Sequence, residues 1–269
     1  MMQPQVTILI PHYKTLPLTK VCLQLLHKQT DLAKAKIVVI ENGSQDDSLD
    51  YLKTLPWIDV VPRTVEQGES PVQSHARALD LGLSRVSTPY VLSIHTDTLV
   101  LHPHWLTFLM NHLEKDSTIA GVGSWKLESK SFWRRALKRI EYAGERILSL
   151  RRTKRGGKSS DLATAATADH YLRSHCALYR TDLLKKYHLH FSNGDQVAGK
   201  YIHQQLIARG HQMIFLPSEI LMKYLIHLNH ATTVLNPALS RRTRVDKDLA
   251  RIRKQLRAVS KADAIEMPF

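Results

Sequence analysis

The sequence predicts an α/β fold with a mainly parallel sheet flanked by helices, similar to a Rossmann fold. Short apolar runs rich in strand-forming residues alternate with helical patterns through the first half of the chain. Three of these runs, at 6–10, 37–40 and 90–94, end abruptly in polar residues. Open α/β sheets place nucleotide sites at the carboxyl edge of their strands, where such polar residues gather.

In the first half, each expected strand is a short apolar run, and each expected helix repeats apolar residues at spacings of three and four. The helix near 17–29, for example, carries Leu18, Val21, Cys22 and Leu25 on one face. In order, the elements are strand 6–10, helix 17–29, strand 37–40, helix 46–54, strand 58–61, helix 71–86, strand 90–94, a helix from Pro103 to about 114 and strand 119–123. This alternation indicates parallel strands covered by helices.

The second half is less regular. An amphipathic pattern predicts a helix over 131–150, and a stretch rich in Gly, Ser, Thr and Ala at 154–168 is typical of a loop. The remaining expected elements are strand 177–179, helix 181–187, helix 198–209 with Gly210 as its C-cap, strand 213–216 and a basic helix over 240–261.

The chain carries a formal net charge of +14 at pH 7, and this charge is concentrated in two segments. Segment 126–158 holds twelve Lys and Arg against three acidic residues, and segment 240–261 holds nine against two. Localised basic charge indicates an anionic partner, namely nucleic acid, a phosphate-bearing substrate or an anionic membrane. A nucleic-acid-binding protein is disfavoured, because no aromatic residues interleave with the basic ones and no known nucleic-acid motif accompanies them.

Cellular location is predicted from what the sequence lacks. No stretch approaches the roughly 18 apolar residues of a membrane span, and the first residues do not resemble a secretory signal. The two cysteines, Cys22 and Cys176, stand in apolar contexts and are expected to be reduced packing residues. We therefore expect a cytoplasmic protein, either free or peripheral on the inner face of the cell membrane.

The three strand ends carry a combination of motifs that resembles a known family. The first reads Pro11-His12-Tyr13, the second Glu41-Asn42-Gly43-Ser44-Gln45-Asp46, and the third His95-Thr96-Asp97. In this order they resemble the inverting family-two glycosyltransferases with the GT-A fold, whose strands end in Pro-x-Tyr-Asn, Asp-Asn-Gly-Ser-x-Asp and Asp-x-Asp. The resemblance implies that a sugar moves from a nucleotide-diphospho-sugar donor to a glycan or lipid-linked acceptor with inversion.

The resemblance also implies which residues contact the donor. Glu41 would accept hydrogen bonds from the base or ribose, and Tyr13 would pack against the base while Pro11 fixes the turn. The full expected donor set is Pro11, Tyr13, Glu41, Asn42, Ser44, His75, His95 and Thr96. The alternative is that residues 41–47 form an ordinary strand–turn–helix connection with a cap.

A divalent metal, Mn²⁺ or Mg²⁺, is implied as cofactor, with Asp97 as its carboxylate ligand. One or two carboxylates suffice, because phosphate oxygens and water fill the other positions. The family's first Asp is replaced by His95, which faces ribose or metal and suits Mn²⁺ better than Mg²⁺. A histidine near the C-terminal end of the fold closes the metal site in many GT-A enzymes, and His227 or His230 can do so here, from one side of a helix or around a bend.

Two further family motifs are altered. Where the family has Arg-Asn-x-Gly, this chain reads Leu79-Asp80-Leu81-Gly82, so His75 or Arg77 would take over the phosphate contact. Where the family has Glu-Asp before a helix, this chain reads Ala198-Gly199.

Inversion needs a carboxylate base for the acceptor hydroxyl. The nearest carboxylate to the altered pair is Asp195, with Asp169 as the fallback and His203 left open. These departures also leave room for a catalytically inactive relative that binds sugar nucleotides.

We expect one GT-A domain over 1–235, with a nucleotide-sugar-binding half at 1–125 and an acceptor-side half at 126–235. A basic helical tail at 236–269 follows, expected to be solvated or to contact a partner. The 131–150 helix combines Phe132 and Trp133 with basic residues, a pattern typical of an interfacial helix on anionic lipid. The alternative is a core-packed helix with a solvated basic face.

Overall fold

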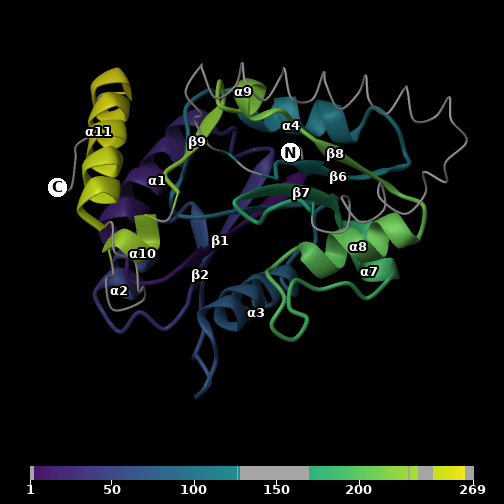
Figure 1. Cartoon of the computed structure of the whole chain (residues 1–269), viewed down its shortest axis with the longest axis horizontal. Helices are drawn as coiled ribbons and strands as arrows, with labels where there is room; N and C mark the ends of the chain where they lie inside the picture. Colours follow the sequence, from purple (N-terminus) through teal and green to yellow (C-terminus); the bar gives the residue numbers. More distant parts are fainter. Residues whose placement is uncertain (1–2, 126, 128–169, 230, 236–244, 264–269) are drawn as a thin grey trace, which may run out of the picture.

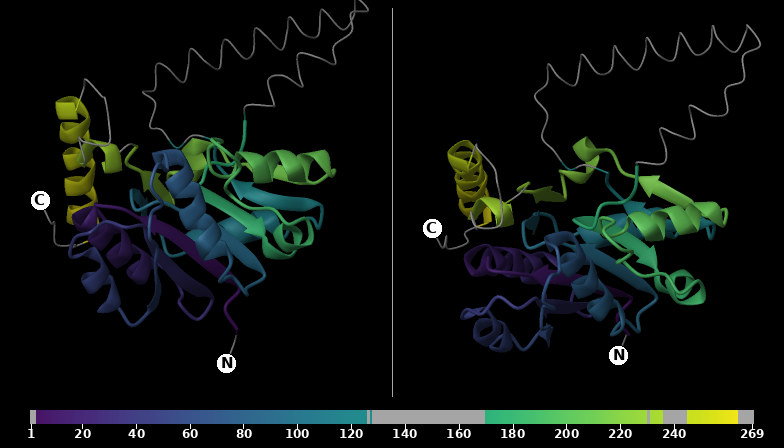
Figure 2. Two further views of the ribbon diagram at one scale, coloured as in Figure 1. Left: turned by 90° about the horizontal axis from the view of Figure 1, so that it is seen from below. Right: turned by 60° about the horizontal axis from the view of Figure 1, so that its bottom comes forward.

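The computed structural model describes residues 3–125, 127, 170–229, 231–235 and 245–263, and these form a seven-stranded sheet with helices on both faces (Figures 1 and 2). The strand order is β3-β2-β1-β4-β7-β6-β8. The strands are β1 (Val6–His12), β2 (Ala35–Glu41), β3 (Ile58–Pro62), β4 (Tyr90–Ile94), β6 (Ile119–Gly123), β7 (Cys176–Arg180) and β8 (Gln212–Phe215). The first four are parallel, whereas β7 runs antiparallel to both of its neighbours, so the predicted mainly parallel α/β sheet is confirmed.

Two apolar layers sandwich this sheet. One layer contains α1 (Leu16–Gln29), α2 (Ser48–Lys53) and α4 (Trp105–Leu113), and the other contains α3 (Pro71–Leu83), α7 (Thr181–Lys186) and α8 (Lys200–Ala208). Side chains alternate between the layers along each strand. In β1, Ile8 and Ile10 join the first cluster and Leu9 joins the second. The predicted first-half elements are all present, whereas the helix expected at 131–150 and the loop at 154–168 lie outside the described residues.

Four short elements are not anticipated by the sequence patterns: β5 (Thr98–Val100), α9 (Ser218–Leu221), β9 (Leu225–His227) and α10 (Ala231–Leu235). Strands of three residues are too short to show a periodicity. β5 and β9 pair antiparallel in a separate two-stranded sheet, with Thr98 opposite His227. This pairing brings a segment from the second half of the chain to the end of β4.

The basic C-terminal helix α11 (Val245–Asp263) packs against the domain beside α1 and α10 (Figure 1). Its buried residues Ile252, Leu256 and Val259 join a cluster with Leu18 and other residues of α1. The expectation of a solvated tail is therefore wrong for this face of the helix. The opposite face is exposed and carries the basic residues Lys247, Arg253, Lys254 and Arg257.

Pro11 lies inside β1, opposite Ile40 of β2, and not in the turn that the sequence predicts. The carbonyl of the next residue, His12, accepts a hydrogen bond from the backbone of Asn42 on the β2 side. Because neighbouring residues of a strand alternate in direction, the nitrogen of Pro11 faces β4. The ladder between β1 and β4 has already ended at Leu9, so the missing N–H of proline costs no hydrogen bond.

Both cysteines are buried and unpaired, as the sequence predicts. Cys22 belongs to α1 and Cys176 begins β7. Burial raises the pKa of both thiols to about 12, so they act as small packing groups. Across the described parts of the chain, no helix is both long and apolar enough to cross a membrane.

The first prediction concerns His203, a buried histidine of α8 whose ring lies 5.4 Å from that of Phe215. Burial lowers its pKa from 6.5 to about 4. The unfolded chain therefore binds a proton that the folded chain does not, and stability falls as the pH drops below 6.5. Between about pH 7.5 and about pH 5 this group should cost about 2 kcal/mol of unfolding free energy.

Denaturant unfolding of the parent and of His203→Gln at these two pH values checks this. Between these two pH values, the free energy of unfolding of His203→Gln should fall by about 2 kcal/mol less than that of the parent. The exposed His190, replaced by Gln, is the control and should behave as the parent. An identical pH dependence for the parent and His203→Gln would contradict the assignment.

Candidate functional site

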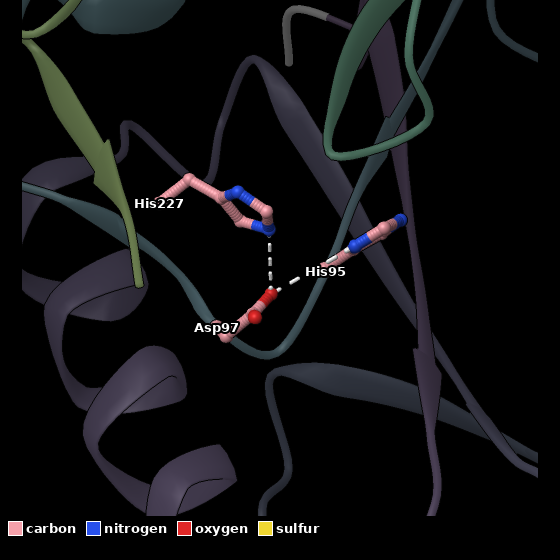
Figure 3. A group of neighbouring side chains, drawn as sticks. All are labelled: His95, Asp97 and His227. Carbon is pink, nitrogen blue, oxygen red and sulfur yellow. Dashed lines mark ion pairs between the residues drawn. The ribbon is translucent and has the colours of Figure 1, made fainter. Parts of the chain in front are cut away.

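Three side chains, Asp97, His95 and His227, meet at the carboxyl end of β4 (Figure 3). Asp97 lies in the connection between β4 and β5, and His227 ends β9. The Nε2 atom of His227 lies 3.0 Å from Oδ1 of Asp97, and the Nδ1 atom of His95 lies 3.8 Å from the same oxygen. The three potential ligand atoms all lie within 4.8 Å of one another.

The segment that follows β9 encloses Asp97. The backbone N–H of Leu228 donates to the carbonyl of Asp97 at 2.9 Å, and that of Ala231 donates to Oδ2 at 3.3 Å. Asp97 is only 3% exposed as a result. Of the two histidines proposed from sequence, the structure places His227 on this carboxylate, at a strand end and not on a helix; His230 lies outside the described residues.

Opposite shifts in pKa accompany this contact. Burial alone would raise the pKa of Asp97, but His227 and His95 more than offset it and the net pKa is lowered. Burial alone would lower the pKa of His227, but the Asp97 carboxylate raises it above its ordinary value. The carboxylate therefore remains charged and favours a positive charge on His227.

Two further histidines surround the triad. His175 stacks on His227 with ring centroids 4.5 Å apart, and His75 meets His95 edge-on at 4.8 Å. Nε2 of His175 lies 2.8 Å from Oγ of Ser124. Burial lowers the pKa of His75 to about 4 and that of His175 to about 3, so both are neutral at neutral pH.

Sequence reasoning missed His175 and its neighbour Ser174, whose hydroxyl lies 2.9 Å from Nε2 of His95 and 3.2 Å from Nε2 of His75. In the sequence, the one feature that marks these two residues is that they directly precede a strand. That signal points to the site only once β7 is known to run antiparallel beside β4, which brings the start of β7 to the end of β4. His75 itself contacts His95, as expected of a residue bordering the site.

The triad has the donor chemistry of a divalent metal site. Nε2 of His227 and Oδ1 of Asp97 are buried and face each other at 3.0 Å, and among the described residues neither has a hydrogen-bond partner beyond this contact. Each histidine ligand is held through its other ring nitrogen, His95 by Ser174 and His227 by Asn229 at 2.9 Å. Two imidazole nitrogens and one carboxylate favour Mn²⁺ and other transition metals over Mg²⁺.

The end of β2 forms a tight turn closed by Glu41. Its carboxylate accepts hydrogen bonds from the backbone N–H groups of Ser44 at 2.7 Å and Gly43 at 3.3 Å. Gly43 has a φ of 72°, which glycine adopts without strain. Glu41 therefore shapes this turn, and its expected contact with base or ribose remains a prediction.

Asn42 ties the end of β2 to α3. Its side-chain N–H donates to Oγ of Ser74 at 3.0 Å, and its oxygen accepts from Arg63 at 2.8 Å. Arg63 also pairs with the buried Glu69. The arrangement orders the loop before α3.

Arg77, one of the two residues expected to contact phosphate, instead forms ion pairs with Glu66 and Glu69. The backbone N–H of Lys14 donates to Oγ of Ser44 at 3.1 Å, which joins the ends of β1 and β2. The half-buried Tyr13 follows β1, and its ring lies 5.4 Å from the ammonium of Lys14.

The connection between β4 and β5 contains another expected donor contact. Thr96 is buried there, 3.4 Å from the hydroxyl of Thr15, which precedes α1. All the donor-site residues expected from sequence thus lie at or beside the carboxyl ends of β1, β2 and β4.

Asp195 is exposed in the loop before α8, where its carboxylate accepts a hydrogen bond from Gln73 of α3 at 2.9 Å. Asp80 of α3 holds the start of the same loop through the backbone N–H groups of Phe191 and Ser192. The loop is thereby fixed against the helix that carries His75. Asp169 lies outside the described residues.

Comparison with known proteins gives one family and several similar folds. The sequence model of the family described as Glycosyl transferase family 2 matches residues 7–188. No protein with a curated description matches the chain significantly.

Three solved structures share the fold. The mannosyltransferase PcManGT from Pyrobaculum calidifontis, in complex with GDP-Man and Mn²⁺, has a TM-score of 0.57 and 16% identity over 98% of this chain and 77% of that one. Residues 1–349 of S. aureus TarS have a TM-score of 0.53 and 14% identity over 96% and 73%. Glucosyl-3-phosphoglycerate synthase from Mycobacterium tuberculosis, with Mn²⁺, UDP and glucosyl-3-phosphoglycerate, has a TM-score of 0.51 and 16% identity over 98% and 81%.

The second prediction concerns Asp97→Asn. The amide keeps an oxygen for the N–H of Ala231 but removes the negative charge that faces His227. Mn²⁺ alone, at about 100 times its dissociation constant, should stabilise the parent by about 2.7 kcal/mol. It should leave Asp97→Asn unchanged.

Thermal unfolding with and without Mn²⁺ measures this difference. Asp50→Asn, which removes an exposed carboxylate of α2, is the matched control and should respond to Mn²⁺ as the parent does. Equal stabilisation of the parent and Asp97→Asn by Mn²⁺ would show that the metal lies elsewhere.

Proposed function

The chain belongs to glycosyl transferase family 2, whose members transfer sugars from nucleotide sugars, and we propose that it does so with metal assistance and with inversion at the sugar carbon. The observation that carries the proposal is the triad at the end of β4, in which the buried Asp97 faces the half-buried His95 and His227. In an open α/β sheet, the crevice beside such a strand end is where a nucleotide binds.

Mn²⁺ is the proposed metal, held by Oδ1 of Asp97, Nδ1 of His95 and Nε2 of His227. When bound, it neutralises the negative charge that develops on the leaving diphosphate. Two relatives of this fold are known with Mn²⁺, one with GDP-Man and one with UDP. The nitrogen-rich donor set of this chain supports the same metal class.

The proposed donor site lies along the ends of β1, β2 and β4. Its residues are Pro11, Tyr13, Glu41, Asn42, Ser44, His75, His95 and Thr96. Three contacts support their acting together. They are the hydrogen bond from the backbone of Lys14 to Ser44, the hydrogen bond from the side chain of Asn42 to Ser74, and the contact between the rings of His75 and His95. In this proposal the donor would lie beside the metal, with its diphosphate toward Asp97.

Asp195 is the proposed base. The acceptor hydroxyl oxygen bonds to the sugar carbon while its proton passes to the Asp195 carboxylate, and the bond from that carbon to the diphosphate oxygen breaks. The hydrogen bond to Gln73 supports this role, because it holds the carboxylate beside the first turns of α3, which also carries His75. Asp169, which precedes the described segment beginning at residue 170, is the alternative base.

The third prediction follows from this role. Asp195→Asn keeps the shape of the side chain but cannot take a proton, so sugar transfer should fall by roughly 10²–10⁴-fold. Donor affinity should change little, because Asp195 is not among the donor contacts. Single-turnover transfer and donor titration, measured separately, check both statements.

Asp182→Asn is the matched control, since it alters an exposed aspartate of α7 nearby in sequence. Near-full turnover of Asp195→Asn would remove Asp195 as the base and direct attention to Asp169.

An inactive sugar-nucleotide-binding relative is the second candidate. The observation that favours it is the absence of a carboxylate at Ala198-Gly199, where the family places Glu-Asp, together with Leu79 in place of the family's arginine. A screen of UDP-, GDP- and dTDP-sugars with Mn²⁺ distinguishes the two. Stabilisation by a donor without any transfer or hydrolysis of its sugar would favour the inactive relative.

A glycan or lipid-linked acceptor at an anionic membrane surface is proposed from charge. Segment 126–158 is strongly basic, and the exposed face of α11 adds Lys247, Arg253, Lys254 and Arg257. Each Lys or Arg near an anionic bilayer contributes about 1 kcal/mol, screened by salt. Such a surface would hold the enzyme beside an acceptor carried on lipid.

The fourth prediction is binding to anionic liposomes at low salt and not to neutral ones. Replacing Arg134, Arg135, Lys138 and Arg139 by Gln should weaken co-sedimentation strongly, and Trp133→Ala should weaken it further by removing an apolar anchor. The matched control replaces four exposed lysines outside both basic segments, Lys53, Lys115, Lys185 and Lys186, by Gln, and it should sediment as the parent does. Equal sedimentation of the parent and the four-Gln variant would contradict a membrane role for 131–155.

A further inference from the structure

The imidazole of His227 is held in one tautomer by Asn229. Nδ1 of His227 lies 2.9 Å from Oδ1 of Asn229, and Nδ2 of Asn229 donates to the carbonyl of Leu127 at 3.2 Å. The second bond fixes the orientation of the amide, because a carbonyl oxygen can only accept. Oδ1 of Asn229 is likewise only an acceptor, so Nδ1 of His227 must carry a proton.

A neutral His227 with its proton on Nδ1 has a lone pair on Nε2. That lone pair faces Oδ1 of Asp97 at 3.0 Å. Two acceptors facing each other in a buried site repel unless a proton or a metal ion lies between them, and a metal ion bound here takes the place of that proton. The hydrogen bond from the far side of the ring therefore prepares Nε2 as a metal ligand.

Asn229 is itself held by the C-terminal helix. Its backbone has a φ of 48°, in the left-handed region that asparagine tolerates better than most residues. Its carbonyl accepts a hydrogen bond from the guanidinium of Arg251 at 2.9 Å. Arg251 lies on α11 next to Ile252, which is buried in the cluster formed with α1. A continuous chain of contacts thus joins α11 to the metal site.

We propose that Asn229 is a positioning residue for the metal, which fixes the tautomer of His227, and that Arg251 of α11 holds Asn229 in place. The inference rests on the metal site of the proposed function. Both residues lie beyond the stretch that matches the family model, which ends at residue 188.

Asn229→Gly and Asn229→Asp test the proposal as a pair, because both residues accept a left-handed backbone. Glycine removes the acceptor for Nδ1 of His227, whereas aspartate keeps one. Mn²⁺ alone is the probe, with its affinity read from the electron paramagnetic resonance signal of the free ion. The nitrogen couplings of the bound ion report imidazole ligands.

The glycine variant should bind Mn²⁺ about 10–100-fold more weakly than the parent and lose the coupling of one imidazole. The aspartate variant should bind no more than about threefold more weakly than the parent and keep both couplings. Equal affinity of the two variants would overturn the inference, whether both match the parent or both fall with a general loss of folding. A parent that binds Mn²⁺ without nitrogen coupling would overturn the proposed metal site as well.

Arg251→Met tests the link to α11. Methionine keeps an apolar stem and removes the donor to the carbonyl of Asn229, so Mn²⁺ affinity should fall by about tenfold. Arg253→Met, on the exposed face of the same helix, is the control and should bind as the parent. Equal Mn²⁺ affinity of these two variants would show that α11 does not position the site.

Discussion

The buried carboxylate of Asp97 is the constraint on which the site depends. It follows β4, a strand whose apolar residues are buried on both faces of the sheet, so its position is set by the core. The chain must then bring polar groups to it, because a buried charge without partners is unstable. The pairing of β5 with β9 does this, since it places His227 and the N–H groups of Leu228 and Ala231 around the carboxylate.

The surrounding histidines have different electrostatic roles. His227 alone has its pKa raised, because it faces the carboxylate directly. His75, His95 and His175 have lowered pKa values, chiefly through burial. The cluster thus keeps several imidazoles neutral beside one charged carboxylate. Neutral imidazoles are the form that binds a metal, so burial prepares His95 as a ligand, whereas His227 would give up its Nε2 proton on binding one.

The sequence predicts the sheet well because its strands are distinct apolar runs, and it predicts Asp97 and His95 because they directly follow such a run. His175 and Asn229 could not be found in this way. Their roles arise from contacts between residues far apart in sequence, such as Ser124 with His175 and Leu127 with Asn229. The expectation of a solvated tail is wrong for the buried face of α11 for a similar reason. The basic composition of α11 is plain, but its three buried apolar residues indicate packing only once a partner surface is known.

The replacement of the family's first Asp by His95 changes the charge of the site as well as its ligands. A divalent ion held by two carboxylates has no net charge, whereas one held by a single carboxylate and two neutral imidazoles retains one positive charge. The second arrangement attracts a diphosphate more strongly, since Coulomb interactions are large in a partly buried site. The arginine that the resemblance expects at Leu79 is missing from the proposed phosphate site, and a metal held by His95 in place of a carboxylate would supply a positive charge there. In the proposed site, the two departures from the family pattern would therefore compensate each other in charge.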